Sequence, residues 1–104
     1  MDGDQRLLLL GLAMPGSAAD CDAAARAGAA FVVCADIDRE VATACAAAGV
    51  SWIPGAATAG EMRAARDAGA DLVHLFPAAT SGGPRHLRLL RAAYPDLRVI
   101  AGGG

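Results

Sequence analysis

Histidines and cysteines are the residues of this sequence best suited to chemistry. His74 lies in an apolar segment, residues 72–76, and His86 lies in an arginine-rich segment farther along. Because histidine titrates near neutral pH, His74 could act as a general acid or base or donate to an anion. The alternative is a hydrogen-bonded histidine of the core. The sequence contains no lysine, so no side-chain amine is available to form an imine.

The three cysteines, Cys21, Cys34 and Cys45, are odd in number and lack a C-x-x-C spacing. That pattern favours reduced, buried thiols in a cytoplasmic protein over a disulfide framework or a zinc site. A metal at His74 would need two or three partners, and only Cys34 and His86 are plausible. We therefore expect neither a metal nor a cofactor.

The composition is that of one small globular domain, which we expect to span residues 1–104. Hydrophobic residues make up 55% of the chain and the net charge is −2, so neither nucleic acid nor an anionic membrane is expected as a partner. No segment is apolar over the roughly 18 residues of a membrane span. The apolar run at residues 7–14 follows Asp2 and Asp4 rather than the positive residues of a secretory signal, so we expect a buried strand there.

A repeated pattern predicts the fold. Alanine-rich helix ends closed by glycine recur about every 20 residues, at Gly28, Gly49 and Gly69, and glycine readily adopts the left-handed conformation that ends a helix. An apolar run follows each of them, at residues 31–34, 51–54 and 72–76. Together with residues 7–12 and 97–101, these runs predict five strands. Their continuous apolar character is typical of parallel sheets covered on both faces.

Four helices are expected between the strands. Their start signals are Ser17, Asp36 or Asp38, the capping box of Thr58 and Glu61, and Pro84. The apolar stripes of the second and fourth helices are expected at Ile37, Val41, Cys45 and Ala48, and at Leu87, Leu90 and Tyr94. Short alternating units of this kind favour a (β/α) barrel over an open Rossmann sheet, which would also carry a G-x-G-x-x-G after its first strand.

Several short motifs follow one another along the chain: Pro54-Gly55, Thr58, Glu61, Phe76-Pro77-Ala78, Gly82-Gly83 and a terminal glycine pair. In this order and spacing they resemble the 2-keto-3-deoxy-6-phosphogluconate aldolases, a family that also acts on 4-hydroxy-2-oxoglutarate (the KDPG/KHG aldolases). The resemblance covers roughly residues 10–104 and only the middle of the family's barrel. It implies an α/β fold, a partial (half) TIM-type (β/α) barrel of about five parallel strands and four helices.

The resemblance also implies a chemistry that this chain lacks. The family is a trimeric carbon–carbon lyase whose lysine forms an imine with the keto carbon of the substrate. His74 stands at the position that matches this lysine, and an imidazole has no primary amine. Ala101 stands where the family's substrate loop has a threonine. The family's glutamate base, its early arginine and its phosphate-binding turn have no matching positions.

Three functions stay open on these grounds. The first is a non-catalytic relative that binds a small oxo-acid, a phosphorylated sugar acid or a phosphate-like anion. The second is an oligomerising structural module, and the third is an aldehyde-lyase completed by strands from another chain. No catalytic residue is assigned; the candidate ligand-binding residues are His74, Phe76, Pro77, Gly82, Gly83, Gly102 and Gly103.

A half barrel has open sheet edges, here expected at residues 7–12 and 97–101, and would expose the inward-facing Leu72, Phe76 and Val99. We therefore expect a homo-oligomer formed through these edges. Arg85, Arg88 and Arg91 recur at i, i+3 and i+6 of the fourth helix, as a solvated face or as a docking face for an acidic partner.

Overall fold

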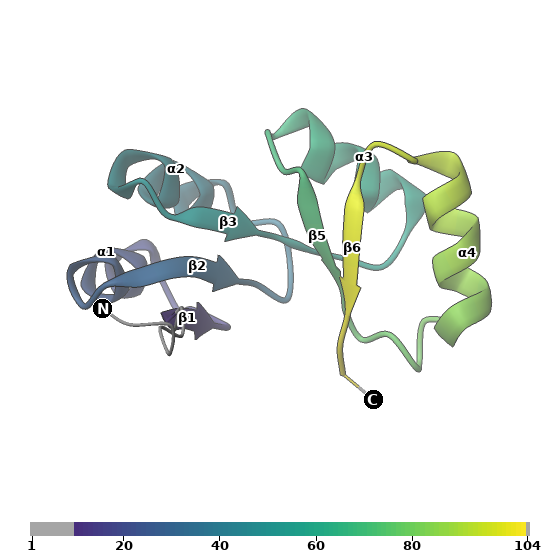
Figure 1. Cartoon of the computed structure of the whole chain (residues 1–104), viewed down its shortest axis with the longest axis horizontal. Helices are drawn as coiled ribbons and strands as arrows, with labels where there is room; N and C mark the ends of the chain where they lie inside the picture. The colour runs from purple at the N-terminus through teal and green to yellow at the C-terminus, as the bar shows by residue number, and fades with distance from the viewer. Residues whose placement is uncertain (1–9, 104) are drawn as a thin grey trace, which may run out of the picture.

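The computed structural model describes residues 10–103, in which parallel strands alternate with helices (Figure 1). Along the chain the elements are β1 (Leu10–Ala13), α1 (Ala18–Arg26), β2 (Ala29–Val33), α2 (Arg39–Ala48), β3 (Ser51–Ile53), β4 (Gly55–Ala56), α3 (Ala59–Asp67), β5 (Leu72–Leu75), α4 (Gly83–Ala93) and β6 (Arg98–Ala101). The predicted partial (β/α) barrel is confirmed. Residues 7–9 of the first predicted strand lie outside the described range. None of the helices within that range is long and apolar enough to cross a membrane.

The strands form two three-stranded parallel sheets, ordered β1-β2-β3 and β4-β5-β6. The prediction of one strand over residues 51–54 is corrected here, because Pro54 separates β3 from β4. Proline has no N–H to donate to a ladder, although the Pro54 carbonyl still accepts a bond from the His74 N–H at 2.8 Å. β1 and β6 are the terminal strands of this arrangement, as expected.

Helix starts follow the predicted signals. Ser17 accepts from the Asp20 N–H at the start of α1, and Asp38 rather than Asp36 caps α2. Thr58 and Glu61 form the capping box of α3. α4 differs, because Pro84 lies in its first turn and no side chain caps that end.

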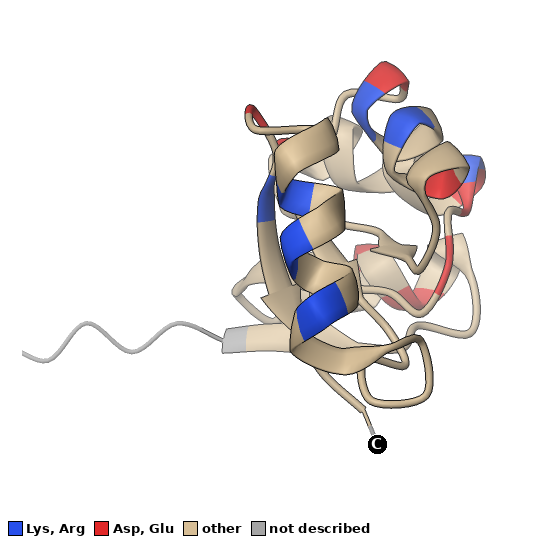
Figure 2. Cartoon of the chain, turned by 90° about the vertical axis from the view of Figure 1, so that its right-hand side faces the viewer, with Lys and Arg blue, Asp and Glu red and all other residues tan. Residues whose placement is uncertain are grey.

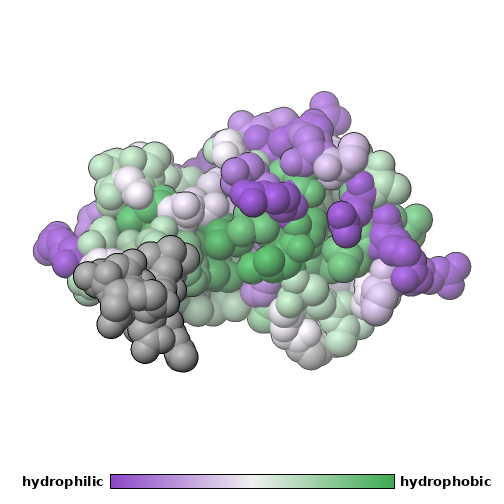
Figure 3. Space-filling model, viewed as in Figure 1, coloured by the Kyte–Doolittle hydropathy of each residue, from purple (hydrophilic) through white to green (hydrophobic). Residues whose placement is uncertain are grey.

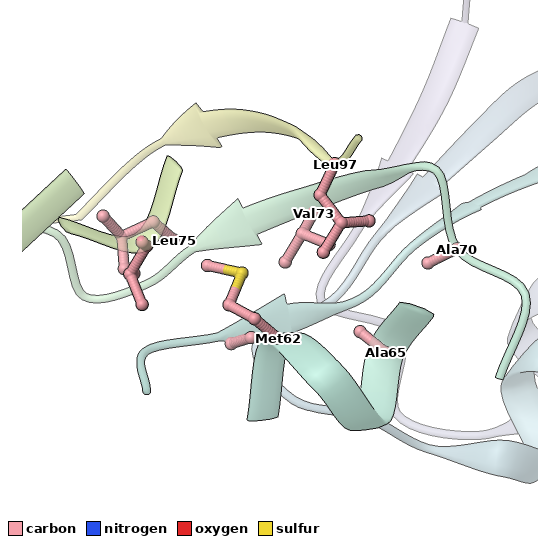
Figure 4. Packing of buried hydrophobic residues seen from close by; sticks show 8 residues of the cluster. Met62, Ala65, Ala70, Val73, Leu75 and Leu97 are labelled. Carbon is pink, nitrogen blue, oxygen red and sulfur yellow. The ribbon is translucent and has the colours of Figure 1, made fainter. Parts of the chain in front are cut away.

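The helices pack on one face of the strands through two clusters of buried side chains, and Figure 4 shows the one that contains Met62, Val73 and Leu75. One cluster joins β2 to α1 and α2, and the other joins β5 to α3 and α4. Their larger members are Cys21, Val32, Cys34, Val41 and Cys45 in the first, and Met62, Val73, Leu75, Leu90 and Leu97 in the second. Burying a Val, Leu or Met side chain completely stabilises the fold by roughly 1.5–3 kcal/mol relative to leaving it exposed.

The apolar stripe predicted for α2 is partly wrong. Val41 and Cys45 are buried, but Ala48 is exposed, and Ile37 precedes the helix and packs against the second cluster. The α4 stripe is confirmed: Leu90 is buried, and Leu87 and Tyr94 pack against the same cluster.

In the part of the chain that the structure describes, no helix lies over the other face of the strands. Figure 1 looks onto this face, with α2 and α3 behind the strands, and Figure 3 shows a hydrophobic band across its middle. Val99 was expected here, and that prediction is wrong. Val99 pairs with Val73 in the register of β5 and β6 and packs on the helix side. Ile100 takes the inward position and is 40% exposed.

The buried thiols give the core a specific pH response. Burial raises the pKa of Cys34 and Cys45 from 9.0 to about 11, and it also raises the pKa of Cys21. Between pH 9 and 11 the folded chain therefore holds more protons than the unfolded chain, so the free energy of unfolding should fall across this window. The chain has no lysine and one tyrosine, so few other groups titrate there.

Urea unfolding at a series of pH values from 8 to 11 measures this fall. Replacing the pair, Cys34→Ala with Cys45→Ala, should flatten the profile even though it lowers stability at every pH. A decline of the same steepness in the variant would contradict the assignment.

Candidate functional site

His74 lies near the carboxyl end of β5 on the face opposite to the helices. Its side chain is buried, with 7% of the residue exposed, and its Nδ1 lies 3.1 Å from the backbone carbonyl oxygen of Cys34. A carbonyl oxygen only accepts, so Nδ1 must carry the hydrogen of this bond. In the neutral ring Nε2 is then a lone-pair acceptor, and in the protonated ring it is a second donor.

Two glycines make room for the imidazole. Gly55 pairs with His74 in the register of β4 and β5, and a Cβ at Gly55 would lie 2.2 Å from the backbone carbon and oxygen of Ala35. Because Gly55 has no side chain, the backbone that follows β2 approaches β4 closely. His74, on the neighbouring β5, is then within hydrogen-bond distance of the Cys34 carbonyl. A Cβ at Gly102 would lie 2.5 Å from His74 Nε2. A side chain at Gly55 or Gly102 would collide with these atoms, so both positions require glycine.

Phe76 and Gly103 extend this group of residues. The rings of His74 and Phe76 have centroids 5.2 Å apart and are tilted by 37°. A Cβ at Gly103 would lie 2.7 Å from the Phe76 ring and 3.4 Å from the Cα of Pro77. Five of the seven predicted ligand-binding residues thus lie together: His74, Phe76, Pro77, Gly102 and Gly103.

A hollow of about 320 Å³ adjoins this group. Gly83 lines it from the first turn of α4, and Gly102 and Gly103 line it from the end of β6. Gly102 therefore belongs to both the hollow and the contact with His74. The remaining walls are apolar, with Leu75, Ala78, Pro84 and Leu87 among them.

Backbone pairing limits what the predicted glycines can bind. The N–H groups of Gly82, Gly83 and Gly102 donate to the carbonyls of Ala79, Ala78 and Leu75 respectively. Among these four glycines, only Gly103 has an N–H without a backbone acceptor in the described range. Three of the four glycines thus have no free N–H for a ligand, and Gly82 does not line the hollow.

The other sequence candidates have structural roles. His86 Nε2 lies 2.5 Å from the carbonyl oxygen of Ala57 and ties α4 to the start of α3. Cys34 meets His74 through its backbone carbonyl rather than its thiol. Within the described range no group of three potential ligands is arranged to hold a metal. Thr58 and Glu61 bond to each other and to nearby backbone as a helix cap.

Sequence reasoning missed two partners of His74. The Cys34 carbonyl is a backbone group, which residue types do not reveal. Gly55 was noted only as part of a motif, although a glycine directly after a proline within an apolar run can signal a close backbone approach.

Known proteins share this architecture. The family model "KDPG and KHG aldolase" matches residues 9–104. The 2-dehydro-3-deoxy-6-phosphogalactonate aldolase of Escherichia coli (strain K12) is 38% identical over 84 residues, which are 80% of this chain and 40% of that protein. The structure of a 4-hydroxy-2-oxoglutarate aldolase/2-deydro-3-deoxyphosphogluconate aldolase from TTHB1 aligns with a TM-score of 0.89 at 37% identity, over 93% of this chain and 48% of that one.

A third similar protein was solved with a small acid. It is the KDPG aldolase from Legionella pneumophila with pyruvate captured as a covalent carbinolamine intermediate. The TM-score is 0.84 at 26% identity, over 92% of this chain and 47% of that one. This chain thus spans between two fifths and half of the length of these proteins.

The close contact at Gly55 leads to a stability prediction with a matched control. Gly55→Ala should lower the free energy of unfolding by about 1–3 kcal/mol, because the new methyl group meets backbone that must shift. Gly60→Ala should raise it by up to about 1 kcal/mol, because Gly60 lies in α3 with nothing within 4 Å of its added Cβ and alanine favours helices. Urea unfolding measures the free energy of unfolding of both variants. If the two substitutions change it by the same sign and size, the close contact at Gly55 is contradicted.

Proposed function

Because this chain belongs to the KDPG and KHG aldolase family and contains no lysine, we propose that it is a non-catalytic relative that binds a small oxo-acid or phosphate-like anion beside His74. A carbinolamine or imine forms when a primary amine attacks a keto carbon, and an imidazole nitrogen offers no such amine. We therefore propose that the chain binds the family's class of ligand but does not form the covalent imine.

The observation that carries the proposal is the bond from His74 Nδ1 to the Cys34 carbonyl. It holds the ring in one orientation and leaves Nε2 as the group available to a ligand. When the ring is protonated, Nε2 donates, and a donor of positive charge forms a strong, short hydrogen bond to a carboxylate or phosphate oxygen.

Two further features favour an anion near this group of residues, at the hollow that shares Gly102 with the His74 contact but that His74 does not line. The Gly103 N–H has no acceptor within the described residues. The first turn of α4 lacks a side-chain cap, so no side chain neutralises the positive end of the helix dipole, although the Gly83 N–H already donates to the Ala78 carbonyl and Pro84 has no N–H. Gly83 and Gly103 line one hollow, whose apolar walls suit the carbon chain of an oxo-acid or sugar acid.

A second function, assembly into oligomers, is favoured by a different observation. Among the described residues, β1 and β6 each have one neighbouring strand, and the inward-facing Ile100 is 40% exposed on β6. Unpaired strand edges next to exposed apolar side chains promote association. A lyase completed by another polypeptide would require that polypeptide to supply the amine as well as the missing strands, and no contact in the chain favours it.

Thermal shift with pyruvate, 2-oxoglutarate, inorganic phosphate and sugar-acid phosphates tests anion binding. A ligand at 100 times its dissociation constant adds about 2.7 kcal/mol of stability. His74→Leu should abolish the shift, because the Nε2 donor is lost. Circular dichroism checks that this variant is folded, since the bond to the Cys34 carbonyl is lost as well. His74→Gln, which keeps an N–H donor, should retain part of it.

His86→Gln is the matched control, because it changes a histidine outside the site and keeps a donor for the Ala57 carbonyl. It should preserve the full shift. The proposal fails if none of these anions stabilises the unmodified chain, or if His74→Leu responds as the unmodified chain does.

A further inference from the structure

The three cysteines lie in one buried cluster although they come from three different parts of the fold. Cys21 lies in α1, Cys34 directly after β2, and Cys45 in α2. They are 2%, 3% and 1% exposed, and all three thiols are free. The candidate site uses none of these sulfur atoms, because Cys34 bonds to His74 through its backbone carbonyl.

Two of these thiols are partners across the interface between α1 and α2, which pack directly against each other. The Cys45 thiol lies within hydrogen-bond reach of the Cys21 sulfur. The Cys21 thiol in turn donates to the Ser17 carbonyl oxygen at the start of α1, with 3.6 Å between sulfur and oxygen. The sulfur atoms of Cys21 and Cys45 therefore face each other within the cluster.

Cys34 belongs to the same cluster but has a different partner. The side chain that interacts with its sulfur is the indole of Trp52, which lies on β3. Cys34 is nevertheless as deeply buried as the other two cysteines. It therefore serves as a control within the chain, since it shares their burial but not their contact.

The contact between Cys21 and Cys45 suits a disulfide, which requires closely spaced Cβ atoms that point toward each other. The bond would join α1 to α2 and close residues 22–44, which include β2 and the first half of α2, into a loop. A cross-link of this kind restricts the unfolded chain and so favours the folded one.

The surroundings of the pair determine the order and the pace of its oxidation. Burial raises the pKa of Cys21, the Cys45 thiol partly opposes this rise by donating toward the Cys21 sulfur, and the carboxylates of Asp20, Asp22 and Asp38 add to it. Burial also raises the pKa of Cys45, from 9.0 to about 11. Because the thiolate is the attacking species, Cys21 reacts first and Cys45 second, and both react more slowly than an exposed thiol.

We propose that Cys21 and Cys45 form a reversible disulfide when the chain is exposed to a hydroperoxide, and that this bond fixes α1 to α2. The proposal is independent of ligand binding beside His74. It assigns to two buried thiols a redox-dependent control of the stability of the fold.

The reaction takes place in two steps. The Cys21 thiolate attacks one peroxide oxygen, so that an S–O bond forms, the O–O bond breaks, and the other oxygen leaves with a proton as water or an alcohol. The Cys45 sulfur then attacks the sulfenic sulfur of Cys21, the S–S bond forms, and the sulfenic oxygen leaves as water. With hydrogen peroxide, two thiols and one peroxide give one disulfide and two molecules of water. A thiol reductant returns both electrons and both hydrogens.

Tryptic mapping of the folded chain after treatment with hydrogen peroxide tests the proposal. The chain has no lysine, so trypsin cuts only at its arginines, which are blue in Figure 2 where the structure describes them. Cleavage after Arg26, Arg39 and Arg63 places each cysteine in its own peptide, at residues 7–26, 27–39 and 40–63. The oxidised chain should lose two hydrogen atoms and give peptide 7–26 linked to peptide 40–63. Peptide 27–39 should keep a thiol that an alkylating reagent modifies after unfolding.

Three variants and one solvent condition serve as controls. Cys34→Ala should form the same bridge, whereas Cys21→Ala and Cys45→Ala, checked for folding by circular dichroism, should form none within the chain. Oxidation in concentrated urea should give a mixture of all three pairings, because only the fold selects one of them. In urea unfolding, the oxidised chain should unfold at a higher urea concentration than the reduced chain, and a thiol reductant should reverse this shift.

Three results would overturn the proposal. The first is a bridge that includes peptide 27–39 in the folded chain. The second is a bridge that joins two separate chains, seen as a doubled mass without reductant. The third is a folded chain that stays reduced, or that gains oxygen without losing hydrogen, while the same treatment in urea produces disulfides.

Discussion

The hydrogen bond from His74 Nδ1 to the Cys34 carbonyl determines the geometry of the candidate site. It joins β5 to the end of β2 across β4, and it forms only because Gly55 has no side chain to keep the two apart. Gly102 closes against the other side of the ring. One bond and two glycines thus fix the orientation of the imidazole, its tautomer and the position of the segment between β2 and α2.

The packing of the strands has a second consequence. All four helices cover one face, where the apolar side chains of β2 and β5 are almost fully buried. Among residues 10–103, no helix covers the face that holds His74, and β1 and β6 each pair with a single strand. In a closed barrel, every strand has two neighbours and the inward face is enclosed. Within the described residues, the proposed ligand binding and the proposed association both use this uncovered face, so the two proposed functions share one physical origin.

Much of the fold could be predicted from the sequence because its signals are local. Glycine at helix ends, Asp38 and the capping box at helix starts, and apolar runs between them act through neighbouring residues. The break at Pro54 and the inward position of Ile100 depend on pairing with β5. Residues 97–101 are apolar apart from Arg98, so no alternation could show which face Val99 occupies. The gathering of His74, Phe76 and Gly103 followed from the family resemblance, whereas the pairing of the Gly82, Gly83 and Gly102 N–H groups is tertiary and has no sequence signal.

The protonation of the His74 ring tests the account most directly. Two-bond ¹⁵N–¹H correlation spectra of the chain at a pH where the ring is neutral distinguish the two tautomers. The account predicts that Nδ1 carries the hydrogen, that Nε2 is the bare nitrogen, and that the Nε2 resonance is the one displaced when phosphate or pyruvate is added. A ring protonated at Nε2 when neutral would contradict it, because the bond to the Cys34 carbonyl would then not exist.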